Sequence, residues 1–235
     1  MHRGSRSADV ELVQLIPAVN STNYPLKPKH ILIVRLGSLG DVVLASPLIR
    51  RLRVKFRRAA IDMLVHERCL ELLDGFDRLD GRIGFPPTRR GRRKTLRALR
   101  RAGYDTVIDL QNNITSRRIT QATGAFRIFR FHRPRWNRWL RIHFPVLRRK
   151  LKVPPPVPLA YIKCAAGLNL QDNGAGLELA VPEEADAAAM RILERFRTEQ
   201  GGLEGEVPLL VAPGARHFTK RWPPERWVEL LNALW

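Results

Sequence analysis

An aspartate in a glycine-containing turn is the residue of this chain with the clearest capacity for chemistry. Asp41 follows Gly40 shortly after the apolar run 31–34, so a carboxylate stands where a buried strand is predicted to end. Such a carboxylate can take a proton from an attacking hydroxyl group as a general base. An acid at a helix start also binds backbone N–H groups and offsets the helix dipole, which is worth about 1 kcal/mol. Both roles are open to Asp41, and they are compatible.

The glycines of the same turn raise the question of nucleotide binding. The dinucleotide fingerprint needs three glycines as G-x-G-x-x-G, whereas Gly37 and Gly40 supply only G-x-x-G. Glu67, near the end of the next predicted strand, could imitate the acid that binds a ribose. A nicotinamide-dependent Rossmann enzyme is therefore an alternative that rests on a partial motif.

A second group of polar residues follows another predicted strand near the C-terminus. Gly214 lies in a turn of small residues, and Thr219, Lys220 and Arg221 come shortly before Pro224, which favours the first turn of a helix. Free N–H groups at a helix start, together with two cations, predict a pocket for a phosphate or pyrophosphate. A solvated basic loop would have a similar composition.

Alternating strands and helices must position these residues. Apolar runs predict strands over 30–35, 61–65, 82–85, 104–109 and 125–131, and amphipathic patterns predict helices over 41–56, 69–73, 94–102, 113–122 and 158–168. This alternation is typical of a parallel, doubly wound α/β sheet. A helix over 183–199, a strand over 207–211 and a helix from Pro224 then begin the pattern again.

The chain is predicted to have three parts. Residues 1–29 form a poorly ordered extension, 30–180 form a Rossmann-like domain with a parallel sheet, and 181–235 form a linker helix and the start of a second, incomplete Rossmann-like domain. No apolar stretch approaches the roughly 20 residues that span a bilayer. Cys69 and Cys164 lack metal-like spacing, so we expect no metal site and a reducing, cytoplasmic environment.

The positive charge of the chain is concentrated in one segment. The formal net charge is +20, and residues 81–171 contain 22 Lys and Arg but only the acids Asp105 and Asp109. The rest of the chain is balanced. This distribution indicates a basic face that meets an anionic partner.

Two parts of that segment are richest in cations. One is a predicted Pro-flanked loop that carries Arg89, Arg90, Arg92, Arg93 and Lys94. The other, 127–149, interleaves cations with aromatic rings, which suits an anionic membrane surface, where each cation adds about 1 kcal/mol. A solvated face or a nucleic-acid-binding surface is the alternative. The sequence has no helix-turn-helix, zinc or RNP signature, so nucleic acid is not expected as a partner.

Three separated blocks resemble the glycosyltransferase family 9 heptosyltransferases, which transfer heptose from ADP-heptose to the inner core of lipopolysaccharide. The blocks are 31–44 (ILIVRLGSLGDVVL), 104–111 (YDTVIDLQ) and 213–215 (PGA) running into 220–223 (KRWP). The resemblance covers most of residues 30–235. It implies a two-domain GT-B fold, in which the first domain binds the acceptor and the second binds the ADP-sugar.

The resemblance also implies roles for individual residues. Asp41 matches the general base of an inverting, metal-independent transfer that uses ADP-heptose as donor substrate and no cofactor, and Lys220 matches the lysine at the donor phosphates. The predicted donor-phosphate residues are Lys220, Arg221, Gly214 and Thr219. The predicted acceptor-cleft residues are Arg35, Gly40, Asp109, Gln111, Arg89, Arg90, Arg92 and Arg93.

The partners that follow are a nucleotide-sugar donor, an anionic glycolipid acceptor (Kdo-lipid A or heptosylated core) and the inner face of the cytoplasmic membrane, where the protein would be peripheral. The chain departs from the family pattern in two ways. Thr115 stands where relatives often carry a basic residue, and Asn112 where some carry Gly. No Asp-Thr-Gly-Leu-x-His type segment occurs before Trp235, so we expect a fragment of a longer protein, with little transferase activity on its own.

Overall fold

The chain forms two compact units, Met1–Ala180 (unit 1) and Val181–Trp235 (unit 2). The structure is a computed structural model that describes residues 27–74, 76–132, 139, 143–144, 153–179, 181–200, 209–215 and 217–234. Most of the predicted extension at 1–29, and much of the aromatic and basic tract at 127–149, lie outside the described residues.

Unit 1 is built on a five-stranded sheet with the order β3-β2-β1-β4-β5. All four strand pairs are parallel. The strands are β1 (His30–Val34), β2 (Ala60–His66), β3 (Gly81–Phe85), β4 (Thr106–Asp109) and β5 (Arg127–Arg130), so every strand predicted for this unit is present.

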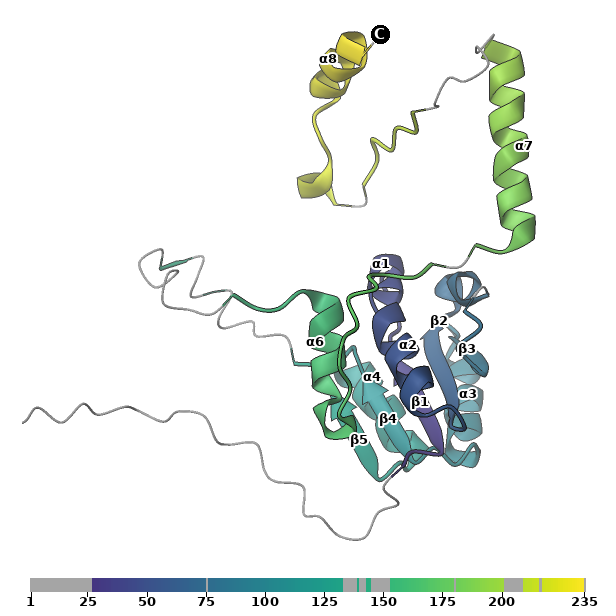
Figure 1. Cartoon of the computed structure of the whole chain (residues 1–235), viewed down its shortest axis with the longest axis vertical. Helices are drawn as coiled ribbons and strands as arrows, with labels where there is room; N and C mark the ends of the chain where they lie inside the picture. The colour runs from purple at the N-terminus through teal and green to yellow at the C-terminus, as the bar shows by residue number, and fades with distance from the viewer. Residues whose placement is uncertain are drawn as a thin grey trace, which may run out of the picture. The chain divides into compact units, whose positions relative to one another are not determined.

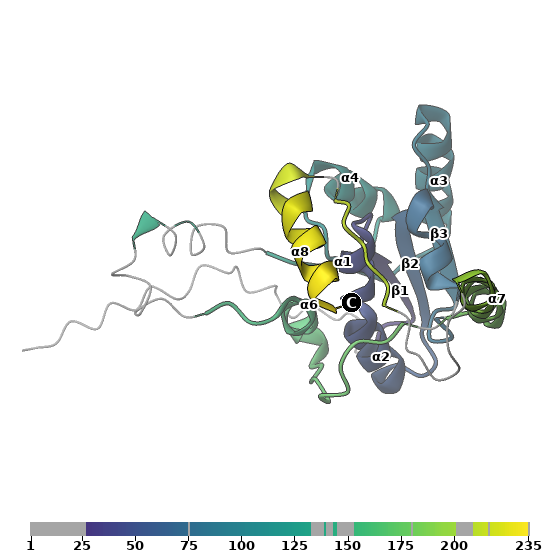
Figure 2. The ribbon, with the colours of Figure 1, turned by 90° about the horizontal axis from the view of Figure 1, so that it is seen from above.

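Helices cover both faces of this sheet (Figures 1 and 2). Five α-helices belong to the described part of unit 1: α1 (Leu39–Val43), α2 (Ser46–Lys55), α3 (Arg89–Arg101), α4 (Ile114–Thr123) and α6 (Val157–Cys164). The same described part contains the 3-10 helices η1 (Glu67–Cys69), η2 (Glu71–Leu73) and η4 (Ala166–Leu168). Core residues of α2 and α6 pack on one face, and those of α3 and α4 pack on the other.

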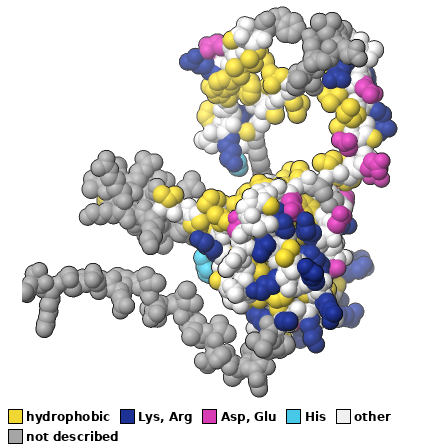
Figure 3. Space-filling view, viewed as in Figure 1, with side chains coloured by type: hydrophobic (Ala, Val, Ile, Leu, Met, Phe, Trp, Pro, Cys, Tyr) yellow, Lys and Arg dark blue, Asp and Glu magenta, His cyan; other side chains and the backbone are white. Residues whose placement is uncertain are grey.

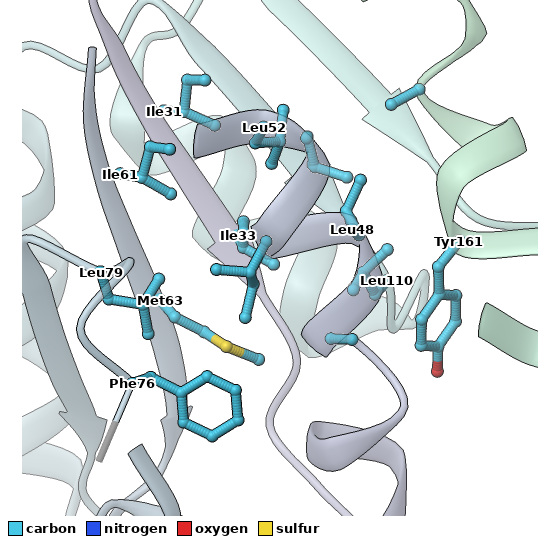
Figure 4. Packing of buried hydrophobic residues seen from close by; sticks show 14 of the residues in the cluster. Ile31, Ile33, Leu48, Leu52, Ile61, Met63, Phe76, Leu79, Leu110 and Tyr161 are labelled. Carbon is cyan, nitrogen blue, oxygen red and sulfur yellow. The ribbon is translucent and has the colours of Figure 1, made fainter. Parts of the chain in front are cut away.

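The alternation of side chains along β1 divides the core into two clusters. Ile31 and Ile33 belong to the cluster under α2 and α6, whereas Leu32 and Val34 belong to the cluster under α3 and α4. Figure 4 shows the first cluster, where Ile31 and Ile33 lie beside Leu48 and the other labelled side chains of α2 and β2. Because both faces are covered, the strand is a continuous apolar run.

The strand order creates one switch point, between β1 and β4. The chain runs from β1 to β2 and β3 on one side and then returns to β4 on the other side of β1. Val34 pairs with Asp109 there, so the carboxyl ends of both strands meet at the same edge. Open α/β sheets bind ligands in the crevice outside this point.

The helix predicted over 41–56 is two helices. α1 ends at Val43, and α2 begins at Ser46 with Pro47 in its first turn. A proline inside a continuous helix would clash with the carbonyl group four residues earlier, here that of Val43, and would lack the N–H that bonds to it. The chain therefore stops one helix and starts another.

The basic helix begins five residues earlier than predicted. Arg89, Arg90, Arg92 and Arg93 are not in a loop but in the first turns of α3, which starts after Thr88. The Thr88 hydroxyl accepts a hydrogen bond from the Gly91 N–H at 3.2 Å, which caps the helix. The first six residues of α3, which are cations and Gly91, contain no large apolar side chain, so the sequence shows no amphipathic periodicity there.

Unit 2 contains α7 (Glu183–Gln200), the 3-10 helix η5 (Phe218–Lys220) and α8 (Pro224–Leu234). The strand predicted over 207–211 is wrong at its described residues, 209–211, which have no regular structure. A strand is held by hydrogen bonds to a neighbouring strand, and the described part of unit 2 contains none.

None of the helices in the described ranges is long and apolar enough to cross a membrane.

Candidate functional site

Asp41 lies in the first turn of α1, just beyond the carboxyl end of β1. Its Oδ2 atom accepts hydrogen bonds from the Ser38 N–H at 3.3 Å and from the Ser38 hydroxyl at 3.1 Å. The side chain of Asp41 is 21% exposed, so the carboxyl group is not sealed inside unit 1. Asp41 therefore caps its helix and still reaches the surface beside the switch point.

Arg35 joins Asp41 to the neighbouring strand. Its side chain is only 7% exposed, and its Nη2 atom forms an ion pair with Asp41 Oδ2. Its Nη1 donates a hydrogen bond of 3.0 Å to the carbonyl group of Leu110, directly after β4. Its Nε is buried and has no hydrogen-bond partner among the described residues. The predicted cleft residue Arg35 thus lies mostly beneath the surface and ties three elements together.

The surroundings of Asp41 lower the pKa of its carboxyl group. Partial burial by itself would raise that pKa, but the positive charge of Arg35 and the hydrogen bonds from Arg35 and Ser38 outweigh it. Asp41 is therefore ionised at neutral pH.

Asp109 does not line an opening, in contrast to the prediction. It is completely buried. Its Oδ1 accepts hydrogen bonds from the N–H groups of Gln111 at 3.0 Å and Asn112 at 2.8 Å, and its Oδ2 accepts one from the Ser116 hydroxyl at 2.9 Å. These hydrogen bonds hold the turn between β4 and α4 over the carboxylate, so the role of Asp109 is to stabilise the backbone at this edge of the sheet.

The turn that Asp109 holds places two amide side chains at the switch point. Gln111 is half-buried, and its Oε1 has no hydrogen-bond partner in the described part of the chain. Asn112 has a φ of 48°, a left-handed conformation that Gly and Asn adopt most readily. A glycine at this position would adopt the same conformation without strain.

Gly40 is exposed on α1, and a Cβ atom added there would meet nothing within 4 Å of the described atoms. The structure therefore gives no steric reason for glycine at this position.

The predicted acceptor-side arginines lie on the exposed side of α3. Eight of the thirteen residues of α3 are Arg or Lys, and none forms an ion pair among the described residues. Six of these eight cations line a shallow hollow of about 1010 Å³: Arg89, Arg90, Arg93, Lys94, Arg97 and Arg101. Figure 3 shows Lys and Arg side chains gathered over unit 1. Because β3 ends at Phe85, shortly before α3, the first turn of α3 starts from the same edge of the sheet as Asp41.

The predicted donor-phosphate residues share one exposed loop of unit 2. Thr219 and Lys220 lie in η5, and Gly214 precedes it. The Nε of Arg221 donates a hydrogen bond of 2.7 Å to the carbonyl group of Ala215, which closes the loop before α8. The structure thus brings all four residues into one loop.

Sequence reasoning missed the residues that hold the site in place. Ser38 had a recognisable signal, because Ser-x-x-Asp before an apolar run resembles a capping box. Ser116 and the carbonyl group of Leu110 had none, because their roles depend on how the edge folds in three dimensions.

Comparison with known proteins assigns the chain to a family. A sequence model of glycosyltransferase family 9 (heptosyltransferase) matches residues 92–235, more than half of the chain. No curated protein matches the chain in sequence.

The solved structures that are similar to this chain include the following three. A family 9 glycosyl transferase from Veillonella parvula has a TM-score of 0.68 at 20% identity, over 89% of this chain and 60% of that one. The ADP-heptose lps heptosyltransferase II of E. coli has a TM-score of 0.55 at 23% identity, over 87% of this chain and 61% of that one. The E. coli heptosyltransferase WaaC with ADP has a TM-score of 0.50 at 19% identity, over 87% of this chain and 63% of that one.

These likenesses show the fold, an α/β architecture of the GT-B type. This chain spans about 60% of the length of the first structure. The match to the family model decides membership, and it includes the basic helix from residue 92 onward, the Asp109 turn and the Lys220 loop. The chain belongs to glycosyltransferase family 9, the heptosyltransferase family.

Proposed function

We propose that this chain belongs to an enzyme that transfers heptose from ADP-heptose to the inner core of lipopolysaccharide, with inversion at the anomeric carbon and without a metal ion. The observation that carries the proposal is the placement of Asp41, a charged carboxylate that reaches the surface at the switch point of a family 9 chain. Unit 1 would bind the acceptor, and unit 2 would supply part of the donor site.

Asp41 would act as the general base. The acceptor oxygen attacks the anomeric carbon, the bond from that carbon to the phosphate oxygen breaks, and its electron pair leaves on ADP. The acceptor proton passes to Asp41. A carboxylate with a lowered pKa is a weak base for a free alcohol, but the attacking oxygen becomes strongly acidic as its new bond forms. Proton transfer late in the reaction therefore suits Asp41, and general-base assistance is typically worth about 10²–10⁴ in rate.

Lys220 and Arg221 would act on the leaving group. Negative charge grows on the diphosphate as the glycosyl bond breaks, so cations placed there lower the barrier. The E. coli heptosyltransferase WaaC, a similar structure, has been solved with ADP-2-deoxy-2-fluoro heptose, which supports a nucleotide-sugar donor for this chain as well.

The cations of α3 would face the acceptor and the membrane that holds it. They are exposed and without ion-pair partners among the described residues, and their first turn starts from the edge where Asp41 lies. Kdo-lipid A and heptosylated core are anionic, so the same helix can steer this glycolipid and hold the protein to the inner face of the cytoplasmic membrane. The protein would thus be cytoplasmic and peripheral.

A binding panel at matched ionic strength tests the proposal. A protein that contains this chain is titrated with ADP-heptose, with single- and double-stranded oligonucleotides and with vesicles that contain anionic lipid. We expect saturable binding of ADP-heptose, and vesicle binding that weakens as salt is added. Changing Arg93, Lys94, Arg97 and Arg100 together to Gln should weaken vesicle binding by roughly 4 kcal/mol, about 1 kcal/mol per cation. Binding of oligonucleotides with none of ADP-heptose would overturn the proposal in favour of a nucleic-acid-binding protein.

The matched control for the four changes on α3 lies on other elements. Arg57, Arg58, Arg191 and Arg195 are exposed cations of the same number, and their replacement by Gln lowers the net charge equally. Equal losses of vesicle binding in the two variants would assign the attraction to total charge and remove the role of α3.

A further inference from the structure

Arg35 is a buried cation whose two terminal nitrogen atoms both have a definite partner. It is 6% exposed as a whole residue and directly follows β1. One nitrogen atom pairs with Asp41, and the other donates to the carbonyl group of Leu110 at 3.0 Å. Burying a guanidinium group is costly unless its charge is paired and most of its N–H groups are bonded. Arg35 meets this need through its two terminal nitrogen atoms, whereas its Nε has no hydrogen-bond partner among the described residues. These two partners therefore hold Arg35 where it is.

Through these two contacts, Arg35 links Asp41 to the chain directly after β4. Leu110 follows β4, and its N–H donates to the carbonyl group of Val34 at 3.0 Å, so Arg35 is anchored to the central pair of strands. Asp41 lies across from this anchor, on a helix of five residues. A helix this short gains little rigidity from its own hydrogen bonds. The orientation of the Asp41 carboxylate is therefore set by Arg35 and Ser38 rather than by the helix.

We propose that Arg35 is a positioning residue, which fixes the Asp41 carboxylate at the switch point and sets the pH range over which Asp41 is charged. The inference rests on the proposed role of Asp41 as a base. Arginine suits this task because its planar group presents N–H donors in fixed directions to two acceptors at once, which the point charge of a lysine cannot do. Arg35 itself would not touch the reacting atoms.

Other charged groups stand near the same turn. The guanidinium of Arg68, which lies on η1, would be 3.8 Å from a Cβ atom added to Gly37. Glu71 belongs to η2, which contacts α1. Ser38 bonds to Asp41 but carries no charge. Arg35 differs from these groups because it forms an ion pair with Asp41. We therefore expect the removal of Arg35 to have the largest effect on the titration of Asp41.

The test is a titration of the Asp41 carboxyl carbon by NMR, in the protein without substrate. In Arg35→Gln the positive charge is lost, the charged form of Asp41 is less favoured, and the midpoint should rise by about one to three pH units. In Arg35→Lys the charge is kept, so the midpoint should stay closer to that of the wild type. Arg53→Gln is the matched control, because it breaks the Arg53–Asp80 ion pair elsewhere in unit 1 and should not move Asp41.

A measurement on the unaltered protein covers the case in which Arg35→Gln does not fold. The side-chain nitrogen resonances of Arg35 should shift with the same midpoint as the carboxyl carbon of Asp41, because protonation of Asp41 breaks the ion pair. Independent midpoints would overturn the inference, as would an unchanged Asp41 midpoint in a folded Arg35→Gln protein.

The pH dependence of transfer separates this inference from the proposed function. If Asp41 is the base and Arg35 positions it, the acidic limb of the kcat/KM profile should move to higher pH in Arg35→Gln, by the shift seen in the carboxyl titration. Failure of the proposed function would leave turnover unaffected by Asp41→Asn. Failure of the Arg35 inference alone would leave Asp41 essential and its midpoint independent of Arg35.

Discussion

At the scale of single residues, two aspartates at one sheet edge have opposite environments. Asp41 and Asp109 both follow apolar strands, so the sequence predicts the position of each. It does not predict that Asp41 is partly exposed beside Arg35 while Asp109 is completely buried among three donors. The difference depends on Ser116 of α4, which only the folded chain brings to Asp109. The apolar pattern therefore predicts where the two aspartates lie along the chain, but it does not predict how deeply each is buried.

The buried aspartate leads to a stability prediction. Replacing Asp109 by Ala should lower the free energy of unfolding by about 2–4 kcal/mol, because charge-assisted hydrogen bonds are lost and buried donors are left unpaired. Urea denaturation measures this value. Asp77→Ala is the matched control, since Asp77 is exposed and should change stability by less than about 0.5 kcal/mol. Full stability of Asp109→Ala with loss of acceptor binding would instead restore Asp109 as a cleft residue.

At the scale of elements, the segment 169–178 is bound along α2 before the chain leaves unit 1 (Figure 1). Lys55 Nζ donates to the carbonyl group of Asn169 at 2.6 Å. Buried Arg50 donates to Asn173 at 3.0 Å and pairs with Glu178 at 2.8 Å. The Glu178 N–H donates to the Ser46 hydroxyl at 2.9 Å. These contacts fix the last part of unit 1 to the helix that follows the Asp41 turn.

Glu178 makes this attachment dependent on pH. Burial alone would raise its pKa, but the hydrogen bonds and charges of Arg50 and Arg78 outweigh burial and lower it. Because the folded pKa lies below the unfolded value of about 4.3, the stabilisation is complete above that value and is lost as the pH falls through the folded pKa. Hydrogen exchange of residues 169–178, corrected for intrinsic rates, should accelerate at these acidic pH values.

The matching variant is Glu178→Gln, which should raise exchange of the segment at neutral pH and remove the acid-dependent increase. Asp172→Asn is the control, because Asp172 is an exposed acid of the same segment. The role of the ion pairs would be refuted by identical exchange profiles in Glu178→Gln and the wild type.

The boundaries of the helices and strands were harder to predict from the sequence than the presence of these elements. The central strand β1 was predictable because burial on both faces leaves a continuous apolar run. The break before Pro47 follows from proline chemistry but was hidden by the apolar pattern on either side of it. The start of α3 depends on a cap at Thr88 rather than on periodicity. The strand at 207–211 was predicted from local composition alone, and strands also need partners.

At the scale of the whole molecule, two properties bear on the proposed function: the distribution of positive charge and the length of the chain. The predicted basic segment has its densest cations on one helix, α3, so the charge asymmetry read from the sequence corresponds to a definite surface. Unit 2 contributes the loop with Lys220 in a chain that spans about 60% of the V. parvula structure. Catalysis is therefore a property to test in a protein that contains this chain together with its donor and acceptor.

Steady-state transfer from ADP-heptose to Kdo-lipid A or heptosylated core by Asp41→Asn tests the central claim most directly. The asparagine keeps an oxygen that can accept hydrogen bonds from Ser38 but cannot take the acceptor proton, so turnover should fall by about 10²–10⁴ while ADP-heptose affinity stays within about two-fold. Asp77→Asn, a change of the same chemistry at an exposed site, should leave turnover as in the wild type. Wild-type turnover in a folded Asp41→Asn protein would contradict the account and leave Asp41 only as a helix cap.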